Sequence, residues 1–415
     1  MDTIFKTHLG LNYEIHDHDK EISPYAPKII YSDKKTNTTG ISIYKHPLLS
    51  ERVIYAQGIN VRNDQKLPCF FQNYSFKGDY PFDLFSMVFY LLTRYEEYLR
   101  FPSDRHGRFS AKQSLAFRND FLDCPIVDFW ILDLKRKIEE KWNLKISLPR
   151  SFRIEPTIDI DTPYAYKHRS ILAHIGGTGR DIFLLRGERL KKRISTLLGQ
   201  QEDVFDSYEY IFSCLHQNGL TAIFFFLMKC QLPDDQNFSV NSKAFEKLVQ
   251  IITDKFEIGI HPSLSSQKSV LLWQKEKRKL ESYSSTRVSS SRQHFLHLAI
   301  PKTYRHLLSE KVTDDFSMAY HDHSGFRAST SVPFYWYDLK KEEPTNLMIH
   351  PAQIMDATLR HHMSLDISSA LIEVQKMKKT IEEVEGVFSF IWHNSSFAEI
   401  YGWKNWKKVF EQCLQ

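Results

Sequence analysis

The feature that most limits the fold of this chain is an alternation, after about residue 150, of strand-like and helix-like segments. The segments "LTAIFFFLM" and "VFSFIW" are almost wholly apolar, and "FRIEPTIDID" and "FEIGIHPS" are rich in strand-forming residues. Between them, residues 208–216, 242–254 and 365–384 have helical character. Apolar strands separated by helices indicate a parallel sheet that is buried on both faces, either a barrel or a doubly wound sheet.

Polar residues stand where these predicted strands end. Asp159 and Asp161 end the first strand, His261 ends a later one, and His393 ends the last. In parallel α/β folds the chemistry lies at the carboxyl ends of the strands. We therefore expect these four side chains to share one site.

The chain is long enough for two domains, and we expect a boundary between residues 148 and 149, beside Pro149 of "LPRSF". Residues 1–148 would form a smaller α+β domain of unknown role, and residues 149–415 the barrel. In the first domain, residues 1–80 resemble short strands and turns, as in "RVIYAQGINV", and residues 81–100 and 127–142 are predicted helices.

Composition excludes several classes of protein. Hydrophobic residues make up 42% of the chain and the formal net charge is only +5, which excludes wholesale disorder and gives no basic stripe for nucleic acid. The five cysteines form no CxxC pair, so a disulfide framework or a thiolate zinc site is not expected. The longest apolar run, residues 222–228, is far shorter than the roughly 20 residues of a membrane helix. We expect a cytoplasmic protein with no transmembrane segment.

The segment "TIDID" places two carboxylates two residues apart, and in a strand both would point to the same face. Two adjacent carboxylates repel each other unless a cation or a proton neutralises one of them. A divalent metal bound by one carboxylate, with the other as a base, resolves the conflict. The alternative is an exposed pair at a strand end or a helix cap.

The two histidines at strand ends have one functional and one structural interpretation each. A neutral His261 would suit Zn, Co or Ni, and a water molecule on such a metal is acidic enough to become a nucleophile. His393 would donate a proton to a leaving amine. Either residue would instead be a structural histidine that backbone groups satisfy.

The ordered set "TIDID", "EIGIHPS", "SRQHFL" and "FIWHN" resembles the NodB-homology polysaccharide deacetylases, carbohydrate esterase family 4. The resemblance covers about residues 152–410. It is closest to a subgroup with an extra N-terminal domain and the phrases "GFR" and "MDATL". It implies a distorted (β/α) barrel that removes an N-acetyl or, less often, an O-acetyl group from a sugar.

By this resemblance Asp159 would be the catalytic base, and Asp161 and His261 would be metal ligands. The family's two acids are usually adjacent, whereas Ile160 separates them here, and its second metal histidine would fall at Ser265. We expect His294 of "SRQHFL" to replace that ligand, with His321 and His323 as lesser alternatives.

The resemblance also implies three supporting residues. Arg292 would orient the base Asp159. Arg327 would hold the substrate, and Asp356 would orient His393 without contacting the substrate itself, although a surface salt bridge or helix capping is the alternative for both.

The predicted activity is hydrolysis of an acetyl group on a carbohydrate by a metal-activated water molecule. The substrate would be an N-acetylated glycan or glycan precursor, with or without a lipid carrier. The alternatives are a hydrolase of another non-peptide C–N bond and a degenerate, non-catalytic glycan-binding or scaffold protein.

Three other segments have weaker interpretations. Residues 175–181, "IGGTGRD", lack the ending of a phosphate loop and are expected to form a turn. Residues 186–193, "RGERLKKR", would be a solvated helix face or, more rarely, a dock for an anionic or lipid-linked glycan. Residues 334–337, all aromatic, would stack on sugar rings or belong to a core.

Overall fold

The computed structural model describes residues 1–17, 23, 25–34, 39–63, 67–169, 171–228 and 240–415. The chain divides into two compact units, neither of which is continuous in sequence. Unit 1 consists of Met1–Arg153, Gly325–Pro351 and Lys379–Val387, and unit 2 of Ile154–Ser324, Ala352–Lys378 and Phe388–Gln415. The domain boundary between residues 148 and 149 stays a prediction, because later segments join unit 1.

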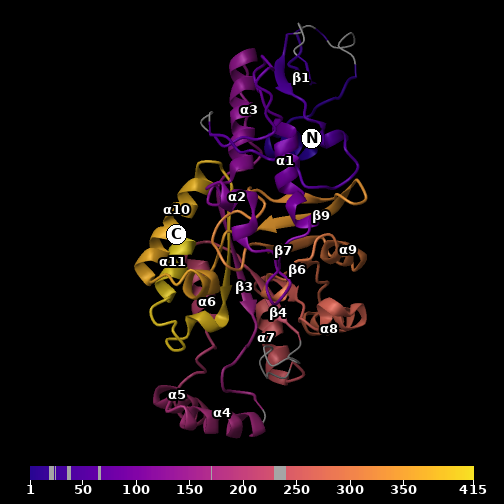
Figure 1. The fold of residues 1–415 in the computed structure, drawn as a ribbon. Helices are drawn as coiled ribbons and strands as arrows, with labels where there is room; N and C mark the ends of the chain where they lie inside the picture. Colours follow the sequence, from indigo (N-terminus) through magenta and orange to yellow (C-terminus); the bar gives the residue numbers. More distant parts are fainter. Residues whose placement is uncertain (18–22, 24, 35–38, 64–66, 170, 229–239) are drawn as a thin grey trace. The chain divides into compact units, whose positions relative to one another are not determined.

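The centre of unit 2 is a curled sheet (Figure 1). Strands β3 to β7 follow one another in parallel, and β10 pairs in parallel with β11, which lies next to β3. The bounds are β3 (Arg153–Ile160), β4 (Ile223–Leu227), β5 (Glu257–His261), β6 (Ser290–Ser291), β7 (Asp314–Met318), β10 (Ile354–Met355) and β11 (Val387–His393). This order confirms the predicted distorted (β/α) barrel.

Helices of unit 2 lie between these strands in the sequence or follow the last of them, and several lie beside the sheet in Figure 1. They are α4 (Ile171–Phe183), α5 (Gly187–Leu197), α6 (Tyr208–Gln217), α7 (Lys243–Thr253), α8 (Val270–Ser284), α9 (Lys302–Ser309), α10 (Ile367–Glu382) and α11 (Lys407–Leu414). Among the described residues, no helix combines the length and apolar character that a membrane span requires.

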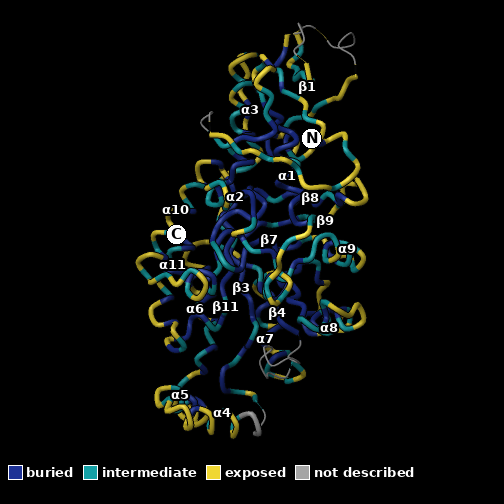
Figure 2. Tube along the Cα trace, viewed as in Figure 1, coloured by how far each residue is buried: buried dark blue, intermediate teal, exposed yellow. Residues whose placement is uncertain are grey.

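The central strands are buried on both faces, as their sequences predict (Figure 2). Phe224, Phe225 and Phe226 of β4 are all fully buried, although their side chains alternate between the two faces of the sheet. Each buried phenylalanine contributes about 1.5–3 kcal/mol to folding. The carboxyl ends of β3 and β5, the strands on either side of β4, carry the polar residues Asp159 and His261.

Unit 1 contains both helices and strands. Its elements are β1 (Ile29–Ser32), β2 (Ile41–Tyr44), α1 (Leu84–Leu92), α2 (Leu115–Arg118), α3 (Ile126–Trp142), β8 (Phe334–Asp338) and β9 (Glu343–Pro351). The strand pair β1–β2 is parallel and β8–β9 is antiparallel. Buried polar contacts join sequence-distant parts of this unit: Asp128 of α3 accepts hydrogen bonds from the backbone and the hydroxyl of Ser331 at 2.8 and 2.7 Å.

Three local predictions are wrong or incomplete. The helix predicted over residues 81–100 is confirmed only for Leu84–Leu92, because Arg94 adopts a left-handed conformation with φ 56° and ends it. Residues 52–61 form no strand. Residues 175–181 are not a turn but lie inside α4, where neighbouring helix formers outweigh the glycines.

Candidate metal and hydrolytic site

Asp159 and Asp161 lie at the carboxyl end of β3. Asp159 is the second-last residue of the strand and is buried, and Asp161 follows the strand's last residue. Both reach the same neighbour: Nε2 of His261 lies 3.3 Å from Asp161 Oδ1 and 3.9 Å from Asp159 Oδ2. The alternation of the strand therefore brings both carboxylates to one face, as the sequence predicts.

His261 is the last residue of β5, two strands away from β3. Its Nδ1 lies 2.7 Å from the carbonyl oxygen of Arg292. A carbonyl oxygen only accepts, so Nδ1 carries the hydrogen and the neutral ring has its lone pair on Nε2. That lone pair faces a carboxylate oxygen, and two acceptors in contact require a cation or a proton between them.

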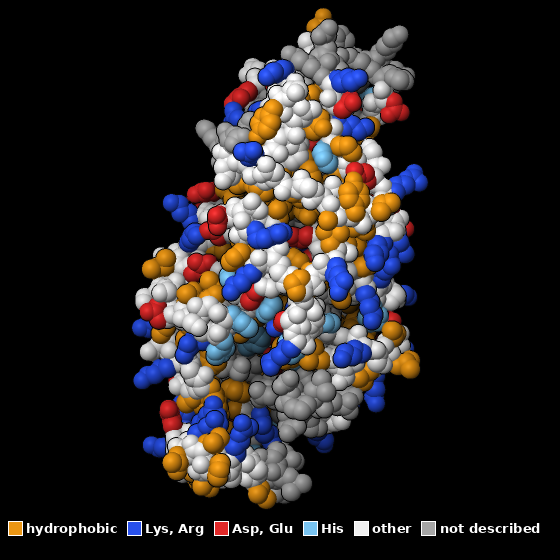
Figure 3. All heavy atoms as spheres, in the orientation of Figure 1, with side chains coloured by type: hydrophobic (Ala, Val, Ile, Leu, Met, Phe, Trp, Pro, Cys, Tyr) orange, Lys and Arg blue, Asp and Glu red, His pale blue; other side chains and the backbone are white. Residues whose placement is uncertain are grey.

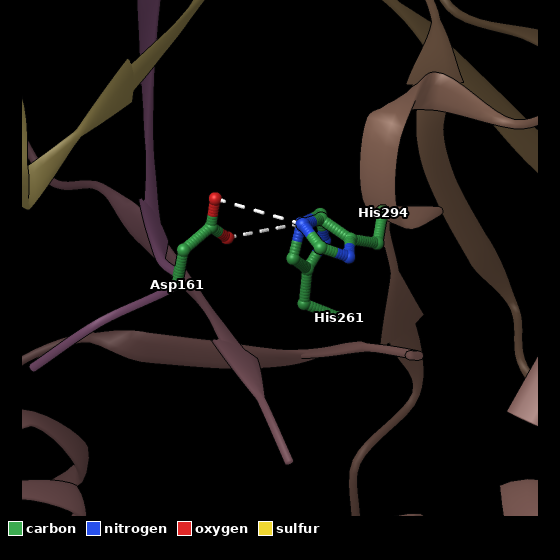
Figure 4. Close-up of side chains that lie close together, drawn as sticks. All are labelled: Asp161, His261 and His294. Atoms are coloured by element: carbon green, nitrogen blue, oxygen red, sulfur yellow. Dashed lines mark ion pairs between the residues drawn. The ribbon is translucent and has the colours of Figure 1, made fainter. Parts of the chain in front are cut away.

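His294 supplies a third ligand atom. It lies in the short helical segment His294–Leu296, just after β6, and its Nε2 is 3.7 Å from Asp161 Oδ2. Donor atoms of Asp161, His261 and His294 all lie within 4.8 Å of one another (Figure 4). One carboxylate and two imidazoles are a donor set that suits zinc, cobalt or nickel.

The electrostatics of Asp161 also fit a cation. Burial opposes ionisation of this carboxyl group, but the charge of His294, the close contacts with the imidazoles of His261 and His294 and the charge of His393 hold its pKa well below the usual value. Its Oδ1 is buried and has no hydrogen-bond partner. A permanently ionised carboxylate with an unsatisfied buried oxygen favours metal binding at these three residues.

Arg292 holds the other carboxylate. Its Nη1 donates to Asp159 Oδ1 at 2.9 Å, its Nε donates to the carbonyl oxygen of Phe316 at 3.0 Å, and its side chain is fully buried. The guanidinium also lies over the ring of Phe225, 4.6 Å from its centroid. These contacts fix one oxygen of Asp159 and leave Oδ2 turned toward the histidines.

His393 ends β11 and Asp356 follows β10. Asp356, which is fully buried, accepts hydrogen bonds from Nδ1 and from the backbone N–H of His393, both at 2.7 Å. Nε2 of His393 then points to the carboxylates, 3.7 Å from Asp161 Oδ2 and 4.0 Å from Asp159 Oδ2. Asp356 thus orients His393.

The protonation of His393 depends on its carboxylate neighbours. Burial alone would lower its pKa, but the charge and hydrogen bond of Asp356, together with the charges of Asp161 and Asp159, raise the pKa from 6.5 to about 10. The imidazole is therefore protonated at neutral pH and can donate a proton from Nε2.

Some predicted residues are not brought to this cluster. Arg327 belongs to unit 1, is buried, and donates to both oxygens of Glu97 at 3.0 and 2.6 Å. This ion pair is buried, so it is not the surface salt bridge of the alternative interpretation, and the substrate role of Arg327 stays a prediction. His321 and His323 interact with Asp322 at 4.0 and 3.6 Å and are outside the triad.

The aromatic residues of "SVPFYWYDL" form β8 of unit 1. Phe334 and Trp336 are buried, whereas Tyr335 is exposed. Tyr337 packs edge-on against Phe89 of α1, with ring centroids 5.5 Å apart. A core role therefore describes most of this segment better than sugar stacking.

Two residues that shape the site were not singled out from the sequence. Asp203 accepts hydrogen bonds from the backbone N–H groups of Ala165, Tyr166 and Lys167 at 2.7–2.8 Å and so fixes the loop after β3. Asn394 donates to the carbonyl oxygen of Thr162 at 3.0 Å and joins the ends of β11 and β3. Asn394 could have been predicted because it follows His393 directly, whereas no local sequence pattern indicates a role for Asp203.

Comparison with known proteins gives a fold likeness. The model of a family of unknown function, DUF7033, matches residues 1–143, and no curated protein matches the chain significantly. A candidate polysaccharide deacetylase from Mycobacterium smegmatis is 11% identical, with a TM-score of 0.41, over 65% of this chain and 85% of that one.

Two further solved structures are similar at the same level. A candidate polysaccharide deacetylase from Pseudomonas aeruginosa is 9% identical, with a TM-score of 0.39, over 64% of this chain and 84% of that one. A mutant of BA3943, described as a CE4 family pseudoenzyme, is 12% identical, with a TM-score of 0.30, over 64% of each chain. All three TM-scores are below 0.5, so the chemistry below rests on the site residues.

Proposed function

We propose that this chain is a metal-dependent hydrolase that removes an acetyl group, preferentially an N-acetyl group, from a carbohydrate. The observation that carries the proposal is the convergence of Asp161, His261 and His294 with a carboxylate held by arginine and a histidine held by aspartate. The choice of an acetylated sugar rests on the ordered motifs of the sequence.

Asp161, His261 and His294 would hold the metal. A divalent ion there would supply a water molecule of lowered pKa and would polarise the acetyl carbonyl. Every other role falls to side chains of the chain itself.

Asp159 is suited to the role of general base. Arg292 engages its Oδ1, and its Oδ2 faces the triad, 3.9 Å from His261 Nε2. Oδ2 would accept a proton from the attacking water molecule while Oδ1 stays fixed. A buried carboxylate with one oxygen fixed has little freedom to turn away from the water molecule it must deprotonate.

His393 is suited to the role of general acid. Its Nδ1–H is taken by Asp356, so the Nε2–H is the proton it can deliver. An amine leaves an amide carbon only when its nitrogen gains a proton, and general acid catalysis of such a step contributes about 10²–10⁴-fold. The products are acetate and an amino sugar.

The rival proposal is a non-catalytic glycan-binding protein, motivated by Ser265 at the position of the family's second metal histidine. Against it, His294 Nε2 lies 3.7 Å from Asp161 Oδ2 and completes a three-residue donor set without residue 265.

The test is acetate release from N-acetylated monosaccharides, nucleotide sugars and short oligomers, with zinc, cobalt or nickel added and with a chelator. We expect metal-dependent acetate release that Asp159→Asn and His393→Ala abolish without loss of bound metal. A metal-loaded, folded protein that releases no acetate from any of these substrates would instead support the glycan-binding alternative.

A further inference from the structure

A polar cavity lies within unit 2, beside the candidate site. It has a volume of about 570 Å³ and is lined by the loop after β3, by α4 and α5, and by residues that follow β10 and β11. Volumes of this size are usual for small-molecule pockets, which span roughly 300–1,000 Å³. The residues that would hold the metal, Asp161, His261 and His294, are not among those lining it.

The charge of this cavity is strongly positive. Its lining contains one carboxylate, that of Asp181, and five guanidinium groups, those of Arg169, Arg180, Arg186, Arg189 and Arg193. Arg193 donates to Asp181 Oδ2 at 2.7 and 3.2 Å and so neutralises the single acid. In Figure 3 Lys and Arg side chains gather where Figure 1 places α4 and α5.

Aromatic rings hold two of these guanidinium groups in place. Arg193 is buried and lies over the ring of Tyr166, 4.8 Å from its centroid, and Arg189 lies over the ring of Tyr401 at 3.9 Å. The hydroxyl groups of the two tyrosines are 2.7 Å apart. The cation–π contacts orient the two guanidinium groups. Because these side chains are already ordered, they lose less conformational entropy when an anion binds.

Gly177 of α4 has a specific role in this packing. A Cβ at this position would lie 2.8 Å from Nη1 of Arg193, so a larger residue would displace the guanidinium. The glycines that resemble a phosphate loop thus serve a different purpose: one of them allows an arginine to pack against a helix.

The cavity begins next to the proton donor of the candidate site. Ser395, which lines it, is two residues after His393. His361, which also lines it, packs edge-on against Trp403, with ring centroids 5.1 Å apart, and follows Asp356 by five residues. A substrate with its acetamido group at Asp161 would therefore extend along this wall toward the arginines.

Guanidinium groups match phosphate oxygens in pairs, and several of them around one cavity fit a group with more than one phosphate. Apolar side chains on the same helical hairpin indicate what the phosphates are attached to. Leu185 is 91% and Phe183 is 85% exposed at the turn between α4 and α5. Further exposed apolar residues of this hairpin are Ile175, Ile182, Leu184, Ile194, Leu197 and Leu198. An exposed apolar face among basic residues is typical of a segment that lies in a membrane interface.

We infer that the arginine-lined cavity binds the diphosphate group of a lipid-linked sugar, with the apolar turn of α4 and α5 in the membrane that carries the lipid. The inference rests on the proposed deacetylase function and names its substrate class: an acetylated sugar on a lipid diphosphate. A soluble nucleotide-linked sugar also has a diphosphate, but it has no lipid or membrane to contact the apolar turn.

The test measures binding, so that its outcome is independent of acetate release. Full-length protein is cosedimented with phosphatidylcholine vesicles that contain a polyisoprenyl diphosphate, with vesicles of equal charge made with phosphatidylglycerol, and with phosphatidylcholine alone. Calorimetry with inorganic pyrophosphate and with a nucleotide diphosphate N-acetylsugar measures binding of the diphosphate without the lipid. We expect preferential binding to the diphosphate vesicles.

Variants separate the contributions of charge and apolar surface. Arg186→Ala with Arg189→Ala should weaken binding to diphosphate vesicles and to pyrophosphate by at least about tenfold, since both substitutions remove charge-assisted hydrogen bonds to phosphate oxygens. Arg189→Lys keeps the charge and should recover only part of the affinity. The matched control removes the same charge from the exposed face of α8, Lys275→Ala with Arg278→Ala, and should bind as the unmodified protein does.

Leu185→Glu should weaken vesicle binding but not pyrophosphate binding, whereas Ile372→Glu, at a 66% exposed position of α10, should change neither. Equal binding to the phosphatidylglycerol vesicles would overturn the inference, as would a double arginine variant that binds pyrophosphate normally. Tight binding of the nucleotide sugar together with an unaffected Leu185→Glu would overturn the lipid assignment. An unmodified protein that binds the diphosphate vesicles but releases no acetate would count against the proposed function alone.

Discussion

Asp356→Asn tests how the chain keeps its proton donor charged. Asp356 accepts from His393 Nδ1 at 2.7 Å, and its charge is the largest influence that raises the pKa of His393 from 6.5 to about 10. The asparagine variant keeps the size of the side chain and can still accept a hydrogen bond from the backbone N–H. It loses the charge, so the pKa of His393 should fall to its ordinary value or below.

The size of the effect follows from the fraction of His393 that is protonated. With a pKa of 10 nearly all of it is protonated at about pH 8, whereas with a pKa of 6.5 only about 3% is. The value of kcat/KM at about pH 8 should therefore fall up to about 30-fold, but less than about twofold at about pH 6. A metal ion in the triad would repel the imidazolium and lower the pKa of His393. The alkaline limit, which is the pH above which activity falls as His393 loses its proton, is therefore expected below pH 10 in the metal-loaded unmodified enzyme and lower still in Asp356→Asn.

The assay is acetate release as a function of pH, with metal content measured on the same samples. Asp128→Asn is the matched control: this carboxylate is also fully buried and hydrogen-bonded, but it belongs to unit 1. It should leave the alkaline limit unchanged. An Asp356→Asn enzyme whose rate falls equally at both pH values would refute the electrostatic role of Asp356.

Two further changes have distinct expected outcomes. Asp159→Asn should retain bound metal but lower kcat about 10²–10⁴-fold, because the base is lost while the metal ligands remain; normal turnover would assign the base elsewhere. Glu97→Ala should lower the free energy of unfolding by about 3–5 kcal/mol in a denaturant titration, since it leaves Arg94 and Arg327 buried without their shared carboxylate. A loss below about 1 kcal/mol would show that this buried network is relaxed or solvated.

The residues at the strand ends were predictable because the signal for each strand lies within a few consecutive residues of the sequence. Apolar runs define each strand, and the residue that follows the run lies at the carboxyl edge of the sheet. This rule locates Asp159, Asp161, His261 and His393 without any knowledge of strand order. His294 required more: its segment had to be matched to a motif, because it sits in a short helical turn after a strand of only two residues.

Features that the sequence did not predict depend on contacts between distant parts of the chain. Arg327 lies in the segment "GFR", but its partner Glu97 stands 230 positions earlier and no local pattern links them. The arginine-lined cavity is equally invisible, since it combines two helices with Ser395 and Trp403. "IGGTGRD" was misjudged because glycines locally favour turns, whereas here the close approach of Arg193 requires one within a helix.

The most direct test of the central claim is the metal content of the purified chain after incubation with zinc, cobalt or nickel and removal of unbound ions. The geometry predicts about one divalent ion per chain, lost in His294→Ala and retained in His306→Ala, a half-buried histidine of α9 outside the triad. A chain that binds no ion, or whose His294→Ala variant binds as well as the original, would contradict the assignment of Asp161, His261 and His294 as one metal centre.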